Sequence, residues 1–131
     1  LSPTMEFREL LLGVQRRVGQ NPESMFAELF RDCGKKLVRF GRLGAFDYLT
    51  MLGKLDLAPV SPGSTFLVNA TGPLRGAKLL VYGSFEANVS PLRLEQLIDR
   101  MDDFLQVGKQ VLEDSICNWQ KNPKNYVYFR G

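Results

Sequence analysis

Apolar residues recur at intervals of three and four along most of this chain. Leu10, Val14 and Val18 show the pattern, which is typical of one buried face of a helix. The same spacing returns four more times. It predicts helices over residues 5–18, 22–37, 43–57 and 72–82, and a longer one of about 25 residues that begins at Pro91. We therefore expect an all-α fold.

Proline, glycine and capping side chains mark the boundaries of these helices. A capping residue or a glycine followed by proline opens three of them: Asn21-Pro22, Gly72-Pro73 and Ser90-Pro91. Gly83 follows the fourth helix, where a glycine can end it in the left-handed conformation. Gly34 predicts a break or kink within residues 33–36, because a glycine inside a helix costs about 1 kcal/mol relative to alanine.

The length of 131 residues is enough for one hydrophobic core without a structural metal or disulfide. We expect one α-helical domain of about five helices over residues 1–131. Residues 1–4 precede Met5 and are either a tag remnant or part of a longer protein. Residues 119–131 are expected to be an extended tail. Its aromatic side chains either clamp the core or stack on bases: Trp119, Tyr126, Tyr128 and Phe129.

The chain has no histidine and two cysteines, Cys33 and Cys117. The lack of histidine excludes Ser-His-Asp and Cys-His catalysis and histidine-rich zinc sites. Both cysteines fall on expected apolar helix faces, which favours buried thiols in a reducing cytoplasm over a disulfide between them. No apolar run approaches the roughly 20 residues of a membrane span, so we expect a cytoplasmic protein without a membrane contact.

The positive charge is concentrated in the middle of the chain. Residues 31–85 hold eight Lys and Arg against three acids, whereas residues 86–118 hold three against seven. The first stretch includes a basic cluster without an intervening acid: Lys35, Lys36, Arg39 and Arg42. Three of these, 35, 39 and 42, share one helix face, which suits contact with phosphates. A solvated basic face is the alternative.

The segment from Gly72 to Gly76 resembles the hairpin of helix–hairpin–helix DNA-binding domains. In such a hairpin a glycine turn exposes backbone N–H groups that can bind a phosphate. Arg75 and Lys78 would add positive charge on the same side. The usual spacing separates the two glycines by one residue, whereas here they lie four apart. The alternative is that Gly76 allows this helix to cross a neighbour closely.

Acidic residues give two further candidates. Asp47 lies with Arg42 in an otherwise apolar, glycine-rich run, which suits either a buried ion pair or a carboxylate at a base or amine site. In a helix Asp47 would be partly screened from water. A second group, Asp99, Asp102 and Asp103, is better explained by a solvated helix face than by a metal site.

Three segments resemble the alpha-glutamyl/putrescinyl-thymine pyrophosphorylases: residues 40–49, residues 51–53 and residues 70–80, within a match over about 38–83. The resemblance implies a helical fold like that of DNA glycosylases. It also implies a transferase that displaces pyrophosphate from an activated 5-hydroxymethyl-uracil in DNA and joins an amine or amino acid to the base.

The resemblance implies roles for particular residues. Arg39, Arg42 and Arg75 would neutralise the pyrophosphate leaving group, and Asp47 would act near the attacking amine. For the shared site to exist, Arg42 and Arg75 must converge. No cofactor is expected, although a divalent metal ion would be compatible with this chemistry. Two alternatives stay open: a DNA-binding or protein-interaction module without catalysis, and a small helical partner subunit whose glycines serve packing alone.

Overall fold

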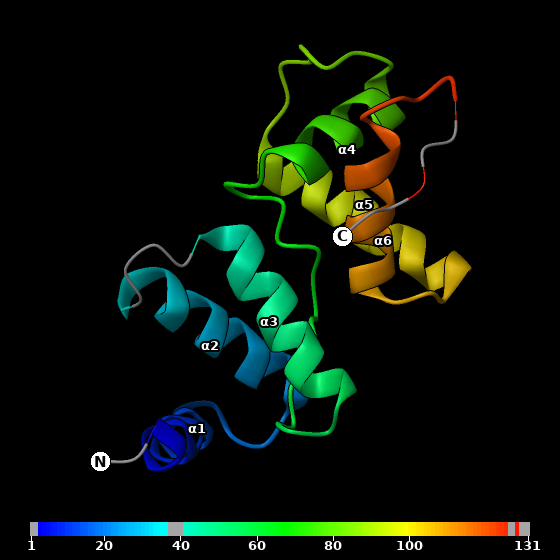
Figure 1. Cartoon of the computed structure of the whole chain (residues 1–131). Helices are drawn as coiled ribbons and strands as arrows, with labels where there is room; N and C mark the ends of the chain where they lie inside the picture. Colours follow the sequence, from blue (N-terminus) through cyan, green and yellow to red (C-terminus); the bar gives the residue numbers. More distant parts are fainter. Residues whose placement is uncertain (1–2, 37–40, 126–127, 129–131) are drawn as a thin grey trace. The chain divides into compact units, whose positions relative to one another are not determined.

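The computed structural model describes residues 3–36, 41–125 and 128. Every regular element in this part of the chain is an α-helix, which confirms the expected all-α fold and adds a sixth helix. The helices are α1 (Pro3–Val18), α2 (Pro22–Lys36), α3 (Arg42–Lys54), α4 (Gly72–Tyr82), α5 (Pro91–Leu105) and α6 (Lys109–Trp119) (Figure 1).

The chain divides into two compact units. Unit 1 comprises residues 1–63 with α1 to α3, and unit 2 comprises residues 64–131 with α4 to α6. Each unit contains its own set of buried apolar side chains. That the two units form a single domain over residues 1–131 stays a prediction.

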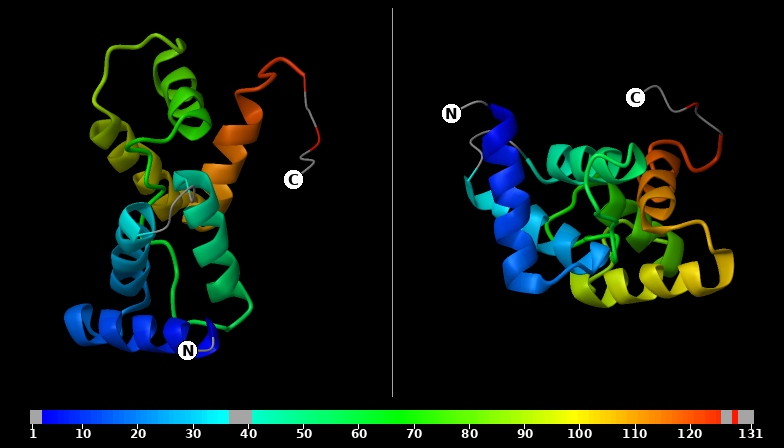
Figure 2. Two further views of the ribbon diagram at one scale, coloured as in Figure 1. Left: turned by 60° about the vertical axis from the view of Figure 1, so that its left-hand side comes forward. Right: turned by 90° about the horizontal axis from the view of Figure 1, so that it is seen from below.

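Aromatic rings form the centre of unit 1. Helices α2 and α3 lie side by side, and α1 runs across one end of the pair (Figure 2). Phe26 of α2 and Phe46 of α3 are fully buried, and their ring centroids lie 5.7 Å apart in an edge-to-face arrangement. Phe30 approaches Phe46 in the same way at 6.4 Å. Such pairs stabilise a core beyond the burial of their surface alone.

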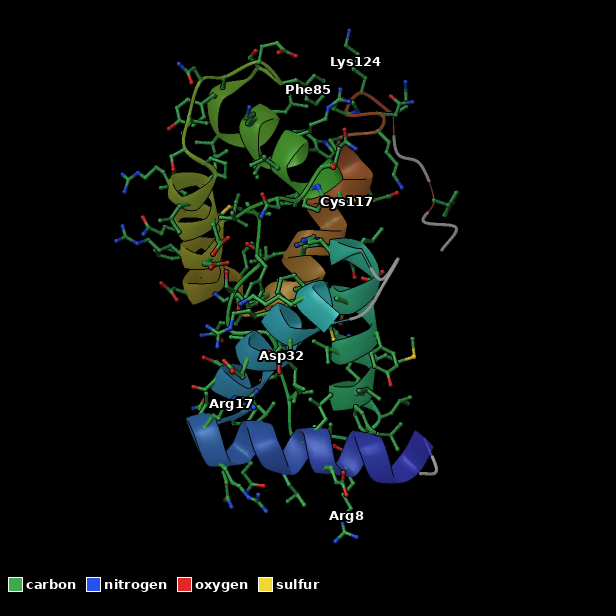
Figure 3. The ribbon with its side chains drawn as sticks, turned by 90° about the vertical axis from the view of Figure 1, so that its left-hand side faces the viewer. Arg8, Arg17, Asp32, Phe85, Cys117 and Lys124 are labelled. Atoms are coloured by element: carbon green, nitrogen blue, oxygen red, sulfur yellow. The ribbon has the colours of Figure 1, made fainter. Side chains whose placement is uncertain are left out.

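Charged side chains join α1 to α2. Arg17 donates from Nε to Glu28 and from Nη2 to Asp32, with both distances 2.9 Å (Figure 3). Arg31 also pairs with Glu28. The Arg17 side chain is 46% exposed, so solvent screens these pairs and each contributes modestly to stability.

Close helix contact organises unit 2. Its core consists of Leu67, Ala77, Leu94, Ile98, Leu112 and Ile116. Gly76 of α4 lies directly against α6, because a Cβ atom at this position would overlap the carbonyl oxygen of Ile116. Gly72, one turn earlier, faces α6 as well. A Cβ there would lie 2.8 Å from Cys117 Sγ.

Local signals predicted several boundaries correctly. Asn21 Oδ1 accepts the backbone N–H of Ser24 at 2.9 Å and so caps α2 as expected. Gly83, with φ +69° and ψ +11°, ends α4 in the left-handed conformation. Cys33 is a buried thiol, as expected, whereas Cys117 is half-buried. Burial is the main cause that raises the pKa of Cys33, and the neighbouring charge of Asp32 adds to it.

Two expected features are wrong. Helix α2 continues through Gly34 to residue 36 without a break, because one glycine penalty is small beside the packing of the rest of the helix. The long helix from Pro91 is in fact two helices. Gln106 at φ +51° and Gly108 at φ +90° leave helical geometry between α5 and α6.

The C-terminal tail is described only in part. Residues 121–125 follow α6 as a turn. Trp119 is 38% exposed and Tyr128 is 76% exposed. Tyr126 and Phe129 lie outside the described residues, so the extended tail stays a prediction.

Candidate functional site

The start of α3 combines a glycine, an arginine and a buried aromatic ring. Gly41 precedes the helix in an extended conformation, with φ −69° and ψ 171°, and the first turn contains no acid. Arg42 is half-buried, and its Cζ atom lies 5.0 Å from the centroid of the Phe46 ring. Because Phe46 is fixed in the core, this cation–π contact orients the guanidinium at the helix start.

Asp47 follows Phe46 and lies on the solvent-exposed side of α3. Phe46 is fully buried, whereas Asp47 is exposed. The interpretation of Asp47 and Arg42 as a buried ion pair is therefore wrong. The reason is that Phe46 faces the core of unit 1, so the next position of the helix, Asp47, falls on its solvent side. An exposed carboxylate is accessible to a solute, which a structural pair would not require.

The basic cluster before α3 is described only at its ends. Lys35 is exposed near the end of α2, and Arg42 begins α3. Arg39 and the side chain of Lys36 lie outside the described residues. Contact of this cluster with phosphates stays a prediction.

The start of α4 holds the second predicted group. Arg75 is exposed, and its Cζ atom lies 4.6 Å from the centroid of the Phe85 ring. Lys78, one turn later, is half-buried. Arg42 belongs to unit 1 and Arg75 to unit 2, so their convergence stays a prediction.

The predicted hairpin glycines have a different setting from the one expected. Both Gly72 and Gly76 belong to helix α4 and not to a turn between helices. Their Cα atoms face α6, and Gly76 is buried. The close helix crossing therefore accounts for both glycines. Their role in phosphate binding stays a prediction.

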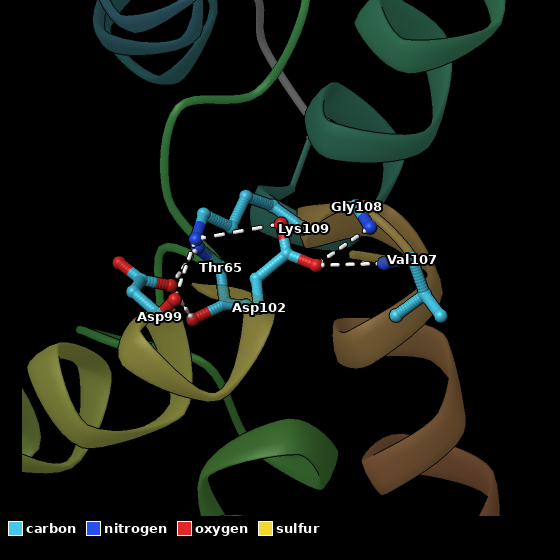
Figure 4. Close-up of polar contacts among 6 residues, drawn as sticks. All are labelled: Thr65, Asp99, Asp102, Val107, Gly108 and Lys109. Carbon is cyan, nitrogen blue, oxygen red and sulfur yellow. Dashed lines mark hydrogen bonds and ion pairs between the residues drawn. The ribbon is translucent and has the colours of Figure 1, made fainter. Parts of the chain in front are cut away.

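The tight connection between two helices occurs instead between α5 and α6. Asp102 Oδ1 accepts the backbone N–H groups of Val107 at 2.9 Å and Gly108 at 2.8 Å (Figure 4). Lys109 Nζ lies 3.6 Å from Asp102 Oδ2. The hydrogen bond from Gly108 is the main cause that lowers the pKa of Asp102, and the charge of Lys109 lowers it further. Asp102 thus holds this connection in one conformation.

A second aspartate fixes the segment that leads into unit 2. Asp99 Oδ1 accepts the backbone N–H of Thr65 at 2.8 Å and its hydroxyl at 2.9 Å. Lys109 Nζ donates to the carbonyl oxygen of Asp99 at 2.6 Å. We expected these aspartates to lie on a solvated helix face. This expectation is wrong for Asp99 and Asp102, whose carboxylates accept hydrogen bonds from backbone N–H groups. Asp103 is exposed as expected.

The interpretation of the sequence also missed Glu113. This residue of α6 is fully buried. Its position between Leu112 and Ile116, on the apolar face of the helix, could have indicated from the sequence that it is buried.

Among the described residues no group of three or more Cys, Asp or Glu side chains is arranged to hold a metal ion.

Comparison with known proteins assigns the chain to a family. The family model for alpha-glutamyl/putrescinyl thymine pyrophosphorylase clade 3 matches residues 1–131, well beyond the segments that suggested the resemblance. This match supports a role in the hypermodification of thymine in DNA. No curated protein and no solved structure matched the chain. In the part of the chain that the structure describes, no helix is long and apolar enough to span a membrane.

Proposed function

The chain belongs to the alpha-glutamyl/putrescinyl thymine pyrophosphorylase family, and on that premise we propose that it joins an amine or amino acid to an activated thymine in DNA. The substrate base is 5-hydroxymethyl-uracil carrying pyrophosphate on its hydroxyl oxygen. The observation that carries the proposal is the family match over all 131 residues. The geometry of α3 supports the roles of individual residues.

The reaction is a displacement at the 5-methylene carbon of the base. The neutral amine nitrogen forms a bond to this carbon, and the bond from the carbon to the pyrophosphate oxygen breaks. The electron pair of that bond leaves with pyrophosphate, and the nitrogen loses one proton. Catalysis then needs positive charge at the leaving group and a base for the proton.

Arg42 is suited to the leaving group. The partial positive charge of a helix N-terminus disfavours a cation in the first turn unless an anion is bound there. The first turn of α3 has no acid to compensate. An incoming pyrophosphate would provide that anion, and it would meet both the guanidinium and backbone N–H groups. Contact with the Phe46 ring uses the face of the guanidinium, whereas a pyrophosphate would bind to its N–H edges.

Asp47 is suited to the attacking amine. Its carboxylate is exposed on α3, five residues after Arg42, so a soluble amine can reach it. An ionised carboxylate attracts the ammonium form and can accept the proton that the nitrogen loses. Lys35, Lys36 and Arg39 of unit 1, and Arg75 and Lys78 of unit 2, are assigned to the DNA phosphates.

The test replaces Asp47 by asparagine, which keeps the shape and removes the charge. Purified protein is mixed with DNA that contains 5-pyrophosphoryloxymethyl-uracil and with an amine, and the nucleosides are analysed by mass spectrometry. Asp47→Asn should abolish the amine adduct and leave the melting temperature nearly unchanged, because the side chain is exposed. Asp103→Asn, the same change at an exposed acid of α5, is the matched control and should retain activity.

Three outcomes would contradict these assignments. Full activity of Asp47→Asn, or a large loss of its melting temperature, would refute the catalytic role of this carboxylate. Binding of DNA by the wild-type chain without any adduct, over a range of amines and amino acids and with Mg²⁺ present or absent, would favour the non-catalytic module.

A further inference from the structure

Charge is strongly segregated within unit 2. Residues 64–85 contain Arg75 and Lys78 and no acid, and residues 115–131 contain three Lys and Arg and no acid. Between them, residues 86–114 contain seven acids and three basic residues. A polyanion would therefore meet repulsion along one part of this unit and attraction along the two acid-free segments.

Helix packing brings these two acid-free segments together. A Cβ atom at Gly72, in the first turn of α4, would lie 2.8 Å from Cys117 Sγ and 3.7 Å from Gln120 Nε2. The start of α4 thus lies beside the end of α6. Lys121 follows Gln120 directly, and Phe85 and Lys124 lie at the same end of the unit (Figure 3).

The side chains at this end are accessible and held in place. Arg75, Lys121 and Lys124 are all exposed. The Phe85 ring, 4.6 Å below Arg75 Cζ, orients the guanidinium. Two hydrogen bonds shape the turn after α6: the N–H of Asn122 donates to the carbonyl oxygen of Trp119 at 3.2 Å, and Asn122 Oδ1 accepts the N–H of Asn125 at 3.3 Å.

We propose that Arg75, Lys121 and Lys124 of the two acid-free segments, together called the acid-free face, bind a single-stranded segment of DNA. The three cations contact successive phosphates, and the half-exposed indole of Trp119 stacks on an unpaired base. An enzyme that acts on a base has to take it out of the duplex stack, which leaves unpaired nucleotides to be held. The choice of DNA as the polyanion rests on the proposed function.

The test measures binding of the full chain to a fluorescent oligothymidine by anisotropy at several salt concentrations. The double variant Lys121→Glu/Lys124→Glu should bind at least tenfold more weakly at low salt. Its plot of log affinity against log salt should be shallower by about 1.4, because each single-strand phosphate contact contributes about 0.7. Trp119→Phe should bind nearly as well as wild type, and Trp119→Ala roughly tenfold more weakly.

The matched control is Arg93→Glu/Arg100→Glu. Both residues are exposed on α5, within the acidic stretch, and this double variant changes the net charge by the same amount. It should bind the oligothymidine like the wild type. Equal weakening by the two double variants would overturn the proposal, since only net charge would matter. Wild-type affinity of Lys121→Glu/Lys124→Glu would overturn it as well.

The outcome is separable from that of the proposed function. Loss of binding in the lysine variant, with no amine adduct formed by any form of the chain, would support the acid-free face and refute the transferase. Unchanged binding in the lysine variant, with an adduct that depends on Asp47, would refute the face and leave the transferase standing. Melting temperatures of the lysine and arginine variants should stay close to the wild type because the substituted side chains are exposed.

Discussion

The two units join three helices each by different physical means. In unit 1 the contacts are made by bulky rings and charged side chains: Phe26 and Phe46 meet in the core, and Arg17 bridges α1 to α2. In unit 2 the closest contact needs the absence of a side chain, at Gly76, and the helix connection is held by one carboxylate on backbone N–H groups.

The glycines at the starts of α3 and α4 have different surroundings. At the start of α3, a Cβ atom on Gly41 would meet nothing within 4 Å, so packing does not require that glycine. At the start of α4, Gly72 and Gly76 are both required by the approach of α6. Unit 1 has a close approach of its own, because a Cβ atom on Gly53, near the end of α3, would overlap the carbonyl oxygen of Val60.

The largest effect is expected in the aromatic core of unit 1. Phe26→Ala removes a fully buried ring that contacts Phe46. The loss of buried surface and the resulting cavity should lower the free energy of unfolding by about 3–5 kcal/mol. Urea unfolding followed by far-UV circular dichroism measures this change. A loss below about 1 kcal/mol would mean that the ring cluster does not organise unit 1.

A smaller effect is expected at the helix crossing of unit 2. Gly76→Ala introduces a methyl group against the Ile116 carbonyl and should cost about 1–3 kcal/mol. Trp119 is the one tryptophan in the sequence and lies in this unit, so its fluorescence follows the unfolding. Gly34→Ala in α2 of unit 1, followed by far-UV circular dichroism, is the control: a Cβ there meets nothing within 4 Å, so the change should stabilise by up to about 1 kcal/mol. Equal effects of the two substitutions would contradict the close crossing.

The smallest effect concerns the carboxylate that holds the α5–α6 connection. The pKa of Asp102 is lower in the folded chain, so its ionised form stabilises the fold above the ordinary aspartate pKa of about 3.9. This stabilisation is lost as the pH falls through the folded-state pKa. Asp102→Asn should therefore be less stable than wild type at neutral pH, and the gap should narrow below about pH 4. Trp119 fluorescence during urea unfolding at several pH values measures the gap, and a constant gap would contradict the prediction.

Helix positions were predictable where the signal is local. Asn21-Pro22 and Gly83 act within one turn of the chain, and both mark boundaries that the structure confirms. The division at Gly108 was not predictable from spacing, because apolar residues continue at helical intervals on both sides of it. At the end of α5, Gln106 has a positive φ, and Asp102 accepts hydrogen bonds from the backbone N–H groups of Val107 and Gly108. These contacts are absent from the spacing of apolar residues.

The candidate site was predictable in its residue types more than in its geometry. The sequence placed Arg42 and Asp47 in one segment, but it did not predict that Arg42 would be half-buried beside Phe46 and Asp47 exposed. The packing role of Gly76 depends on α6, forty residues later in the chain, which no local pattern contains. The burial of Glu113, by contrast, could have been predicted from its position between Leu112 and Ile116 on the apolar face of α6.

The short reach of Asp102 also has a consequence for the order of folding. Its hydrogen bonds join residues only five and six positions apart, so closing this loop costs little chain entropy. The contact between Gly76 and Ile116 closes a much longer loop and depends on both helices being present. We therefore expect the α5–α6 connection to close before α4 packs against α6.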